Sequence, residues 1–178
     1  MRPIKIKVLL ILSAICILYF LFLTGYMIYT QVIIPRRIVQ ERRSLHSIAT
    51  ALESYYIDWS EYPHELEVLT KAPNLKIENG ELKKTGTFLI AVPRSAFGTH
   101  PFPRYFRGRT QGWFVWLPGP DEDFDISLDE NLKSAFDLFW EKRDREKHTI
   151  SSPWLADRLY DPTNGLRSNG DILRTQFQ

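Results

Sequence analysis

Three aspartates are the residues of this chain best suited to chemistry, because they alternate along a short loop after a glycine–proline pair: Asp121, Asp123 and Asp125. Carboxylates at positions i, i+2 and i+4 of a loop can turn several oxygens toward one hard cation, as the first half of an EF-hand calcium loop does. Ile126 stands where that loop requires glycine and Leu132 where it requires the bidentate acid, so the segment is not an EF-hand. The half-motif supplies too few ligands by itself. It therefore predicts either a calcium (Ca²⁺) site or a solvated acidic turn ahead of a helix, whose positive end favours anions.

No pattern in the sequence carries a catalytic mechanism. The G-x-S-x-G, H-E-x-x-H and phosphate-loop patterns do not occur. The four histidines lie on different expected elements, with no cysteine or acid at metal-ligand spacing. Surface histidines are the simpler interpretation, and we expect that the protein is not an enzyme. The histidines are His46, His64, His100 and His148.

Four arginines alternate with aromatic residues in the middle of the chain. Such a mixture can grip single-stranded nucleic acid by phosphate pairing and base stacking, and arginines near a membrane can meet anionic lipid headgroups. More often a hairpin of this kind buries its rings and solvates its arginines, and the formal net charge is only +2. We therefore expect no nucleic-acid partner. This arginine–aromatic cluster comprises Arg94, Phe97, Phe102, Arg104, Tyr105, Phe106, Arg107 and Arg109.

The element that precedes all these residues is an apolar run, in which no charged side chain occurs between Lys7 and Arg36. About 20 apolar residues span the hydrocarbon core of a bilayer, and residues 8–30 exceed that length. Tyr26 and Tyr29 stand where aromatic rings gather at a membrane interface. We therefore expect a single membrane-spanning helix at 8–30 after a short basic tail at 1–7, and not the buried helix of a soluble protein.

A cleaved secretory signal is the main alternative for this run, since basic residues precede it. However, the run is longer than the apolar part of a typical signal, and no small-residue cleavage pattern follows it. The lone cysteine, Cys16, follows Ile15, whereas a lipoprotein acceptor would follow a small residue. We expect an uncleaved anchor and no internal disulfide. Basic residues flank both ends, so their count does not choose the orientation.

Apolar residues continue past the run at helical spacing, so we expect the helix to leave the membrane and extend through residues 31–59 as an amphipathic segment. Glu41 interrupts the apolar stripe, and Pro35, which lacks a backbone N–H, is the expected site of a kink. The stripe is predicted to pack on the soluble domain or on a partner helix. It comprises Ile38, Leu45, Ile48, Leu52, Tyr55 and Trp59.

For the rest of the chain, residues 60–178, we predict one globular domain of the α+β class, with an antiparallel β-sheet packed on the long N-terminal helix. Asn79-Gly80 between alternating residues predicts a hairpin, and residues 87–92 a buried strand. Residues 105–107 and 113–117 predict a second hairpin, in which Trp113, Val115 and Leu117 share one face. We also expect a short helix opened by Pro63 and a turn at 161–165. A further helix is expected over residues 128–148, with a capping box formed by Ser127 and Glu130. Its expected inner residues are Leu132, Phe136, Phe139 and Trp140.

Several segments in order carry a resemblance to a known family. They are residues 52–56 (LESYY), 61–63 (EYP) with Leu66 and Leu69, 112–121 (GWFVWLPGPD), 160–165 (YDPTNG) and 168–172 (SNGDI). With the membrane helix and its extension, this set resembles type IV pilin-like proteins, in particular the G-type pseudopilin of type II secretion.

The resemblance implies a pilin-like fold in the bacterial inner membrane, with a cytoplasmic N-terminus and a periplasmic globular domain. It also implies a structural calcium in a loop of the C-terminal half, and contacts with other pilin-like or secretion-system proteins, including self-association.

The chain also departs from that family. It has no glycine before Gly25 and no acidic residue before Glu41, whereas pilin-like precursors are cut after a glycine and carry a glutamate early in the apolar helix. Two functions therefore stay open. One is a non-enzymatic pseudopilin-like component of a type II secretion or type IV pilus-like system, and the other is a signal-anchored, monomeric periplasmic binding module with a pilin-like fold.

Overall fold

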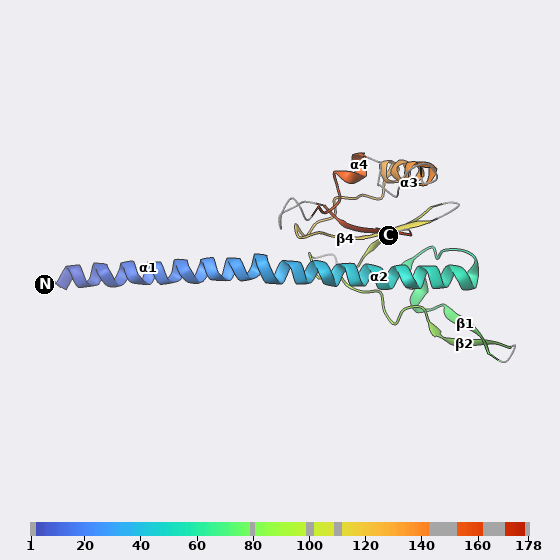
Figure 1. The fold of residues 1–178 in the computed structure, drawn as a ribbon, viewed down its shortest axis with the longest axis horizontal. Coiled ribbons are helices and arrows are strands. Elements are labelled where there is room, and N and C mark those ends of the chain that lie inside the picture. Colours follow the sequence, from blue (N-terminus) through green and yellow to red (C-terminus); the bar gives the residue numbers. More distant parts are fainter. Residues whose placement is uncertain are drawn as a thin grey trace. The chain divides into compact units, whose positions relative to one another are not determined.

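The computed structural model describes residues 3–78, 81–98, 102–108, 112–142, 153–161 and 170–176. The chain forms two compact units, Met1–Arg37 and Ile38–Gln178. In chain order the elements are α1 (Pro3–Ile28), η1 (Tyr29–Ile33), α2 (Ile34–Trp59), η2 (Leu66–Thr70), β1 (Pro73–Glu78), β2 (Glu81–Thr87), β3 (Arg104–Arg107), β4 (Trp113–Leu117), α3 (Glu130–Lys142), α4 (Pro153–Ala156) and β5 (Ile172–Thr175) (Figure 1).

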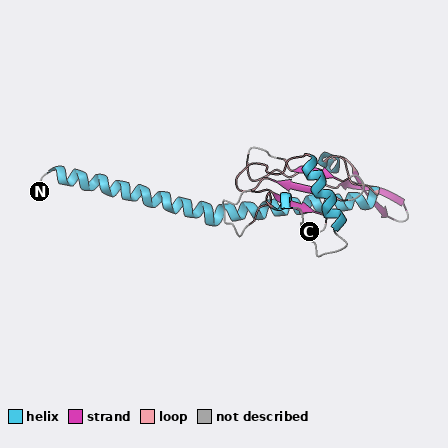
Figure 2. Ribbon diagram, turned by 90° about the horizontal axis from the view of Figure 1, so that it is seen from above, coloured by secondary structure: helices cyan, strands magenta, loops and turns pink. Residues whose placement is uncertain are grey.

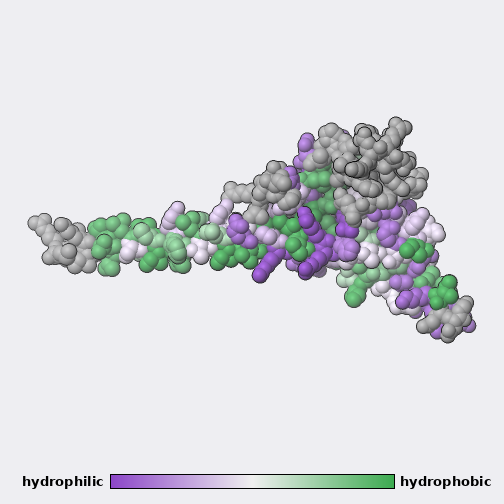
Figure 3. All heavy atoms as spheres, in the orientation of Figure 1, coloured by the Kyte–Doolittle hydropathy of each residue, from purple (hydrophilic) through white to green (hydrophobic). Residues whose placement is uncertain are grey.

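The first unit is helical, and between residues 8 and 33 most of its exposed side chains are apolar; Figure 3 shows them along the visible face. Among the described residues, one helix is long and apolar enough to cross a membrane, and its most apolar window has a mean hydropathy of 2.6 and no buried residue. An apolar helix without a polar face has no favourable place in water. The structure therefore confirms that one helix near the N-terminus is suited to be a membrane span or signal anchor.

We predict that this helix stays on the mature protein. Because the apolar run continues well past the length of a signal sequence, the full-length protein should remain with membranes through alkaline carbonate washing. Mass spectrometry of the retained protein should recover peptides from within α1. A soluble species that begins after Thr24 would contradict this prediction and identify α1 as a removable signal.

The helix changes geometry just before Pro35, where the sequence predicts a kink. Residues Tyr29–Ile33 form a π-helical turn, and the Ile34 N–H donates to the Tyr29 carbonyl, five residues back. Pro35 has no N–H for the carbonyl four residues before it. A single π turn absorbs such a gap in the hydrogen-bond ladder, so the proline acts on the turn that precedes it.

Helix α2 is amphipathic and buries the predicted stripe. Ile38, Leu45, Ile48, Leu52 and Tyr55 are all buried, whereas Trp59, the last residue of the helix, is 43% exposed. Ser60, the residue after the helix, has a positive φ of 59° and donates its N–H to the Tyr56 carbonyl, which closes the last turn. The buried face therefore forms the core of its own domain.

The described residues of the second unit form two separate antiparallel sheets, where the sequence analysis predicted one. The first is the β1–β2 hairpin, in which Glu78 faces Glu81 across the expected Asn79-Gly80 turn, whose residues lie outside those described. It lies at the C-terminal end of α2 (Figures 1 and 2), where the Asp58 carboxylate accepts the Leu75 N–H at 2.8 Å.

The predicted strand over residues 87–92 is wrong. Only Thr87 belongs to a strand, and the residues after it form bends. The Leu89 N–H donates to the Leu69 carbonyl in place of a strand partner, and Phe88 packs edge-on against Tyr55. Ile90 is fully exposed. The apolar run thus packs part of its side chains on α2 without forming a ladder.

The second sheet has the strand order β3-β4-β5, so β4 is central. The predicted pairing of residues 105–107 with 113–117 is confirmed, and Arg107 faces Trp113. All five residues of β4 are buried, because α2 covers one face of the sheet and α3 the other (Figure 1). On the α2 side the Trp113 indole N–H donates to Glu53 at 2.9 Å, and on the α3 side Phe114 packs edge-on against Phe136.

Three further elements differ from the sequence-based expectation. The short helix near Pro63 is the 3₁₀ helix η2, which begins later, at Leu66, with Leu66 and Leu69 buried. Neither α4 nor β5 was predicted, and the expected turn at 161–165 lies outside the described residues after Asp161.

The predicted capping box of α3 is wrong. The Asp129 carboxylate caps the helix by accepting the N–H groups of Asn131 and Leu132, while the Ser127 hydroxyl donates to Asp129. These hydrogen bonds, that from Ser127 first, lower the pKa of Asp129. The helix therefore begins at Glu130, and it is described as far as Lys142. The expected inner residues Leu132 and Phe136 are buried, whereas the side chains of Phe139 and Trp140 lie outside those described.

Candidate metal centre

The structure brings the three predicted aspartates together in the loop between β4 and α3. One carboxylate oxygen from each of Asp121, Asp123 and Asp125 lies within 4.8 Å of the others. Glu122 turns the loop with a positive φ of 70°, and its N–H donates to the Gly119 carbonyl at 3.0 Å. The alternation seen in the sequence thus points three carboxylates toward one place.

A fourth carboxylate, that of Asp171 just before β5, is close enough for the charges of Asp125 and Asp121 to act on it, although it is not one of the three whose oxygens lie within 4.8 Å of one another. Its side chain is fully buried, and one oxygen accepts the Ile126 N–H at 2.7 Å. The backbone of Asp171 is fixed on both sides, since its N–H donates to Arg158 and its carbonyl accepts the Tyr160 N–H. The sequence analysis missed Asp171 as a site residue and placed it only within the SNGDI segment.

Tight backbone packing holds the two halves of this site against each other. A Cβ atom on Gly119 would lie 2.1 Å from the Gly170 carbonyl oxygen. Gly170 has a φ of 120°, and a Cβ there would lie 2.5 Å from the Leu159 carbonyl carbon. No side chain fits at either position. The Gly170 N–H also donates to Asp121 at 3.0 Å, so the loop after β4 and the start of β5 form one cradle.

Three carboxylate oxygens in this cradle are buried and have no hydrogen-bond partner among the described residues: Asp121 Oδ1, Asp125 Oδ2 and Asp171 Oδ1. A buried acceptor without a donor costs free energy, and a charged one costs more. Oxygen ligands are those that calcium prefers. The donor set is therefore of the type that a hard divalent cation prefers.

The electrostatics of the site point the same way. Burial is the main cause that raises the pKa of Asp171, to about 8, and the charges of Asp125 and Asp121 add to it. Burial also raises the pKa of Asp121, with repulsion from Asp125 and Asp123. Without a cation, these raised pKa values favour the protonated, neutral forms of the two carboxyl groups. A bound divalent cation would replace those protons.

The arginine–aromatic cluster is distributed over contacts inside the domain. Arg104 donates to the Ile126 carbonyl and lies over the Phe124 ring at 4.1 Å, and Arg107 donates to the Tyr62 carbonyl. Tyr105 donates to the Pro63 carbonyl, Phe97 is buried, and Phe106 packs against Phe136. Arg94 lies over the Phe102 ring, and Arg109 is outside the described residues. The described arginines thus orient loops, including the one that carries the aspartates.

The sequence analysis also missed the structural roles of two glutamates on α2, the partly buried Glu53 and the fully buried Glu41. Glu53 accepts hydrogen bonds from the Trp113 indole and the Tyr62 hydroxyl. Glu41 accepts one from the Ser95 hydroxyl at 2.6 Å and another from the Ala96 N–H, and burial raises its pKa. Glu41 therefore anchors the segment after β2 and does not simply interrupt the apolar stripe.

Of the four histidines, His46 and His64 are exposed, and the other two lie outside the described residues. Comparison of the chain with protein-family models, with curated proteins and with solved structures gave no match.

Proposed function

We propose that the chain is a membrane-anchored, pseudopilin-like component of a bacterial type II secretion or type IV pilus-like system, and that it acts through protein–protein contacts without catalysing a reaction. The observation that carries this proposal is the order and burial of the elements. An apolar helix comes first, then an amphipathic helix with one buried face, and then antiparallel strands in the same domain. In this proposal the N-terminus is cytoplasmic, α1 lies in the inner membrane and the domain is periplasmic.

The acidic cradle would then hold a structural calcium ion. Asp121, Asp123, Asp125 and Asp171 would be its protein ligands, and the ion would fix the loop after β4 to the start of β5. Support comes from the three buried oxygens without partners and from the close packing of Gly119 on Gly170. The ion would stabilise the domain, and no catalytic step is assigned to it.

Partners would have to use surfaces other than the buried face of α2. The exposed apolar side chains of the domain include Ile57 on the outer side of α2, 78% exposed, and Ile90, fully exposed. An exposed apolar side chain is common by itself, but these two can report neighbours in a membrane assembly.

We therefore predict that a photo-crosslinking residue placed at Ile57 or Ile90 of the full-length protein, in native membranes, gives a ladder of adducts with the chain itself or with pilin-like proteins. Thr50, an exposed polar position on the same helix, is the matched control site and should give fewer adducts. Immunoblotting and mass spectrometry of the adducts provide the measurement. An absence of pilin-like or self adducts at both sites would count against the secretion-system proposal.

The second candidate is a signal-anchored, monomeric binding module, and one observation favours it. The first acidic residue after the apolar run, Glu41, is buried in the domain itself, where it binds Ser95. A carboxylate inside lipid persists only with a partner, and α1 offers none to a neighbouring helix. Recovery of the chain as a monomer without pilin-like adducts would support this candidate.

A further inference from the structure

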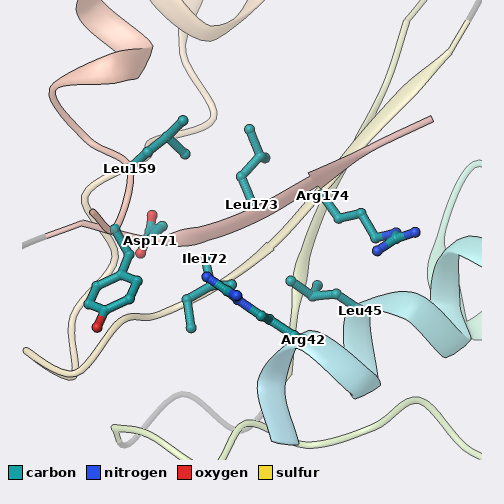
Figure 4. Close-up of a pocket in the computed structure, with 8 residues that line it drawn as sticks. Arg42, Leu45, Leu159, Asp171, Ile172, Leu173 and Arg174 are labelled. Carbon is teal, nitrogen blue, oxygen red and sulfur yellow. The ribbon is translucent and has the colours of Figure 1, made fainter. Parts of the chain in front are cut away.

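A cavity of about 300 Å³ lies inside the second unit, between α2 and the start of β5 (Figure 4). Its lining differs from that of the acidic cradle, because most of the lining residues are apolar or basic. Its lining residues are Arg42, Leu45, Leu159, Tyr160, Asp171, Ile172, Leu173 and Arg174.

Two arginines give the cavity a positive lining. Arg174 projects from β5 on the α2 side of the sheet, where its strand partner is Val115. The Arg174 Nε is buried and has no hydrogen-bond partner among the described residues. A buried guanidinium nitrogen without an acceptor is costly. Arg174 is therefore a donor that is fixed in place and available to a ligand.

Arg42 supplies a second, exposed cation from α2, and no ion pair joins it to a described acid. Asp171 is the one carboxylate in the lining, and it bonds to the Ile126 N–H beside the other aspartates. In Figure 4 the Arg42 side chain extends from the helix toward Asp171, and the Arg174 side chain extends from the strand in a different direction, so the two arginines belong to different parts of the lining. The arginine charges thus stay open to an anion from outside.

The remaining lining fits an apolar group. Leu45 and Ile172 are 1% and 6% exposed. Leu159 and Leu173 also belong to the lining, although their side chains pack against the core on the α3 side of the sheet. The volume is at the low end of ligand sites, which run from roughly 300 to 1,000 Å³. It suits one apolar side chain or a short alkyl chain with an attached anionic group, and it is too small for a nucleotide cofactor.

We propose that this cavity binds a carboxylate attached to an apolar group, with Arg174 as its main hydrogen-bond donor and Arg42 as a second cation. Guanidinium groups match the planar, two-oxygen geometry of carboxylates. Two sources offer this chemistry, namely the carboxyl terminus of a peptide that ends in an apolar residue and a medium-chain fatty acid. The inference is independent of the secretion-system proposal.

The test uses the full-length protein in lipid nanodiscs with calcium present throughout. The probe is a fluorescein-labelled Gly-Gly-Gly-Leu peptide with a free carboxylate, and fluorescence anisotropy reports binding. The peptide with an amidated end should bind at least about tenfold more weakly, the loss expected for a charge-assisted contact of roughly 1.4 kcal/mol. Binding of octanoate, measured by isothermal titration calorimetry against nanodiscs without protein, assigns the fatty acid as the source if the peptide does not bind.

Variants locate the site. Arg174→Gln should weaken binding of the carboxylate probe about tenfold and Arg42→Gln about threefold, while Arg174→Lys should lose most of the affinity because it lacks the fork. Arg43→Gln, at an exposed neighbour of Arg42 outside the cavity, is the matched control and should bind normally. Arg42 is exposed, so its variant is expected to fold. The proposal is overturned if neither probe binds, if the amidated peptide binds equally well, or if Arg42→Gln and Arg174→Gln leave the affinity unchanged.

Discussion

Millimolar calcium should raise the melting temperature of the full-length protein by about 5 to 10 °C relative to chelator. The ion would bind the folded cradle and not the unfolded chain, so it stabilises by mass action. At a hundredfold excess over Kd the gain is about 2.7 kcal/mol. Tryptophan fluorescence in detergent can follow the transition, because Trp113 and Trp116 are fully buried.

Substitutions should assign this effect to the four carboxylates. Asp123→Asn and Asp125→Asn should each remove most of the calcium-dependent shift. Glu130→Gln is the matched control, because Glu130 is an exposed acid at the start of α3 that pairs only with Lys133 in the described structure. Magnesium should substitute poorly, since it resists dehydration and demands octahedral geometry. Melting curves that coincide in calcium and chelator would rule out a calcium site in the cradle.

The sequence predicted best where local chemistry decides the outcome. The amphipathic stripe of α2 follows helical spacing, and five of its six residues are buried. Asn-Gly predicted the first hairpin, and alternation predicted the pairing of β3 with β4. In each case neighbours in the sequence are also neighbours in space, so periodicity and turn chemistry carry the information.

Prediction failed where distant segments decide. Residues 87–92 have the composition of a strand, but the Leu89 N–H is taken by Leu69 and no strand is available to pair. Asp171 and its hydrogen-bond partner Ile126 are 45 residues apart in the sequence. The pairing of β5 with β4 brings the two together. The three loop aspartates were visible from their spacing. For the fourth aspartate, Asp171, the sequence offered a single signal, namely an acidic residue directly before the β-branched Ile172.

In chelator, the free energy of unfolding should fall as pH rises from about 5 to 8, by up to about 1.4 kcal/mol per pH unit for one proton. The pKa of Asp171 is 3.8 in the unfolded chain and about 8 in the folded one. Between these values the folded protein holds a proton that the unfolded chain has released, so a rise in pH favours unfolding. The pKa values of Asp121 and Glu41 are also raised and act in the same direction. Urea unfolding at a series of pH values measures the slope.

The variant Asp171→Asn should reverse the usual effect of a buried substitution. Its amide oxygen can still accept the Ile126 N–H, and its side chain cannot ionise, so it adds no charge to the repulsion with Asp121 and Asp125. In chelator at pH 8 the variant should therefore be more stable than the wild-type protein. Its free energy of unfolding should also depend less steeply on pH, and the dependence that remains should come partly from Glu41. In calcium the wild-type protein should be the more stable of the two, because the variant offers the cation one charged ligand fewer. Calcium should also stabilise the wild-type protein more at pH 8 than at pH 5, because its ligands must be deprotonated. If Asp171→Asn is less stable than wild type in both conditions, the side chain is a packing group and Asp171 is not a cation ligand.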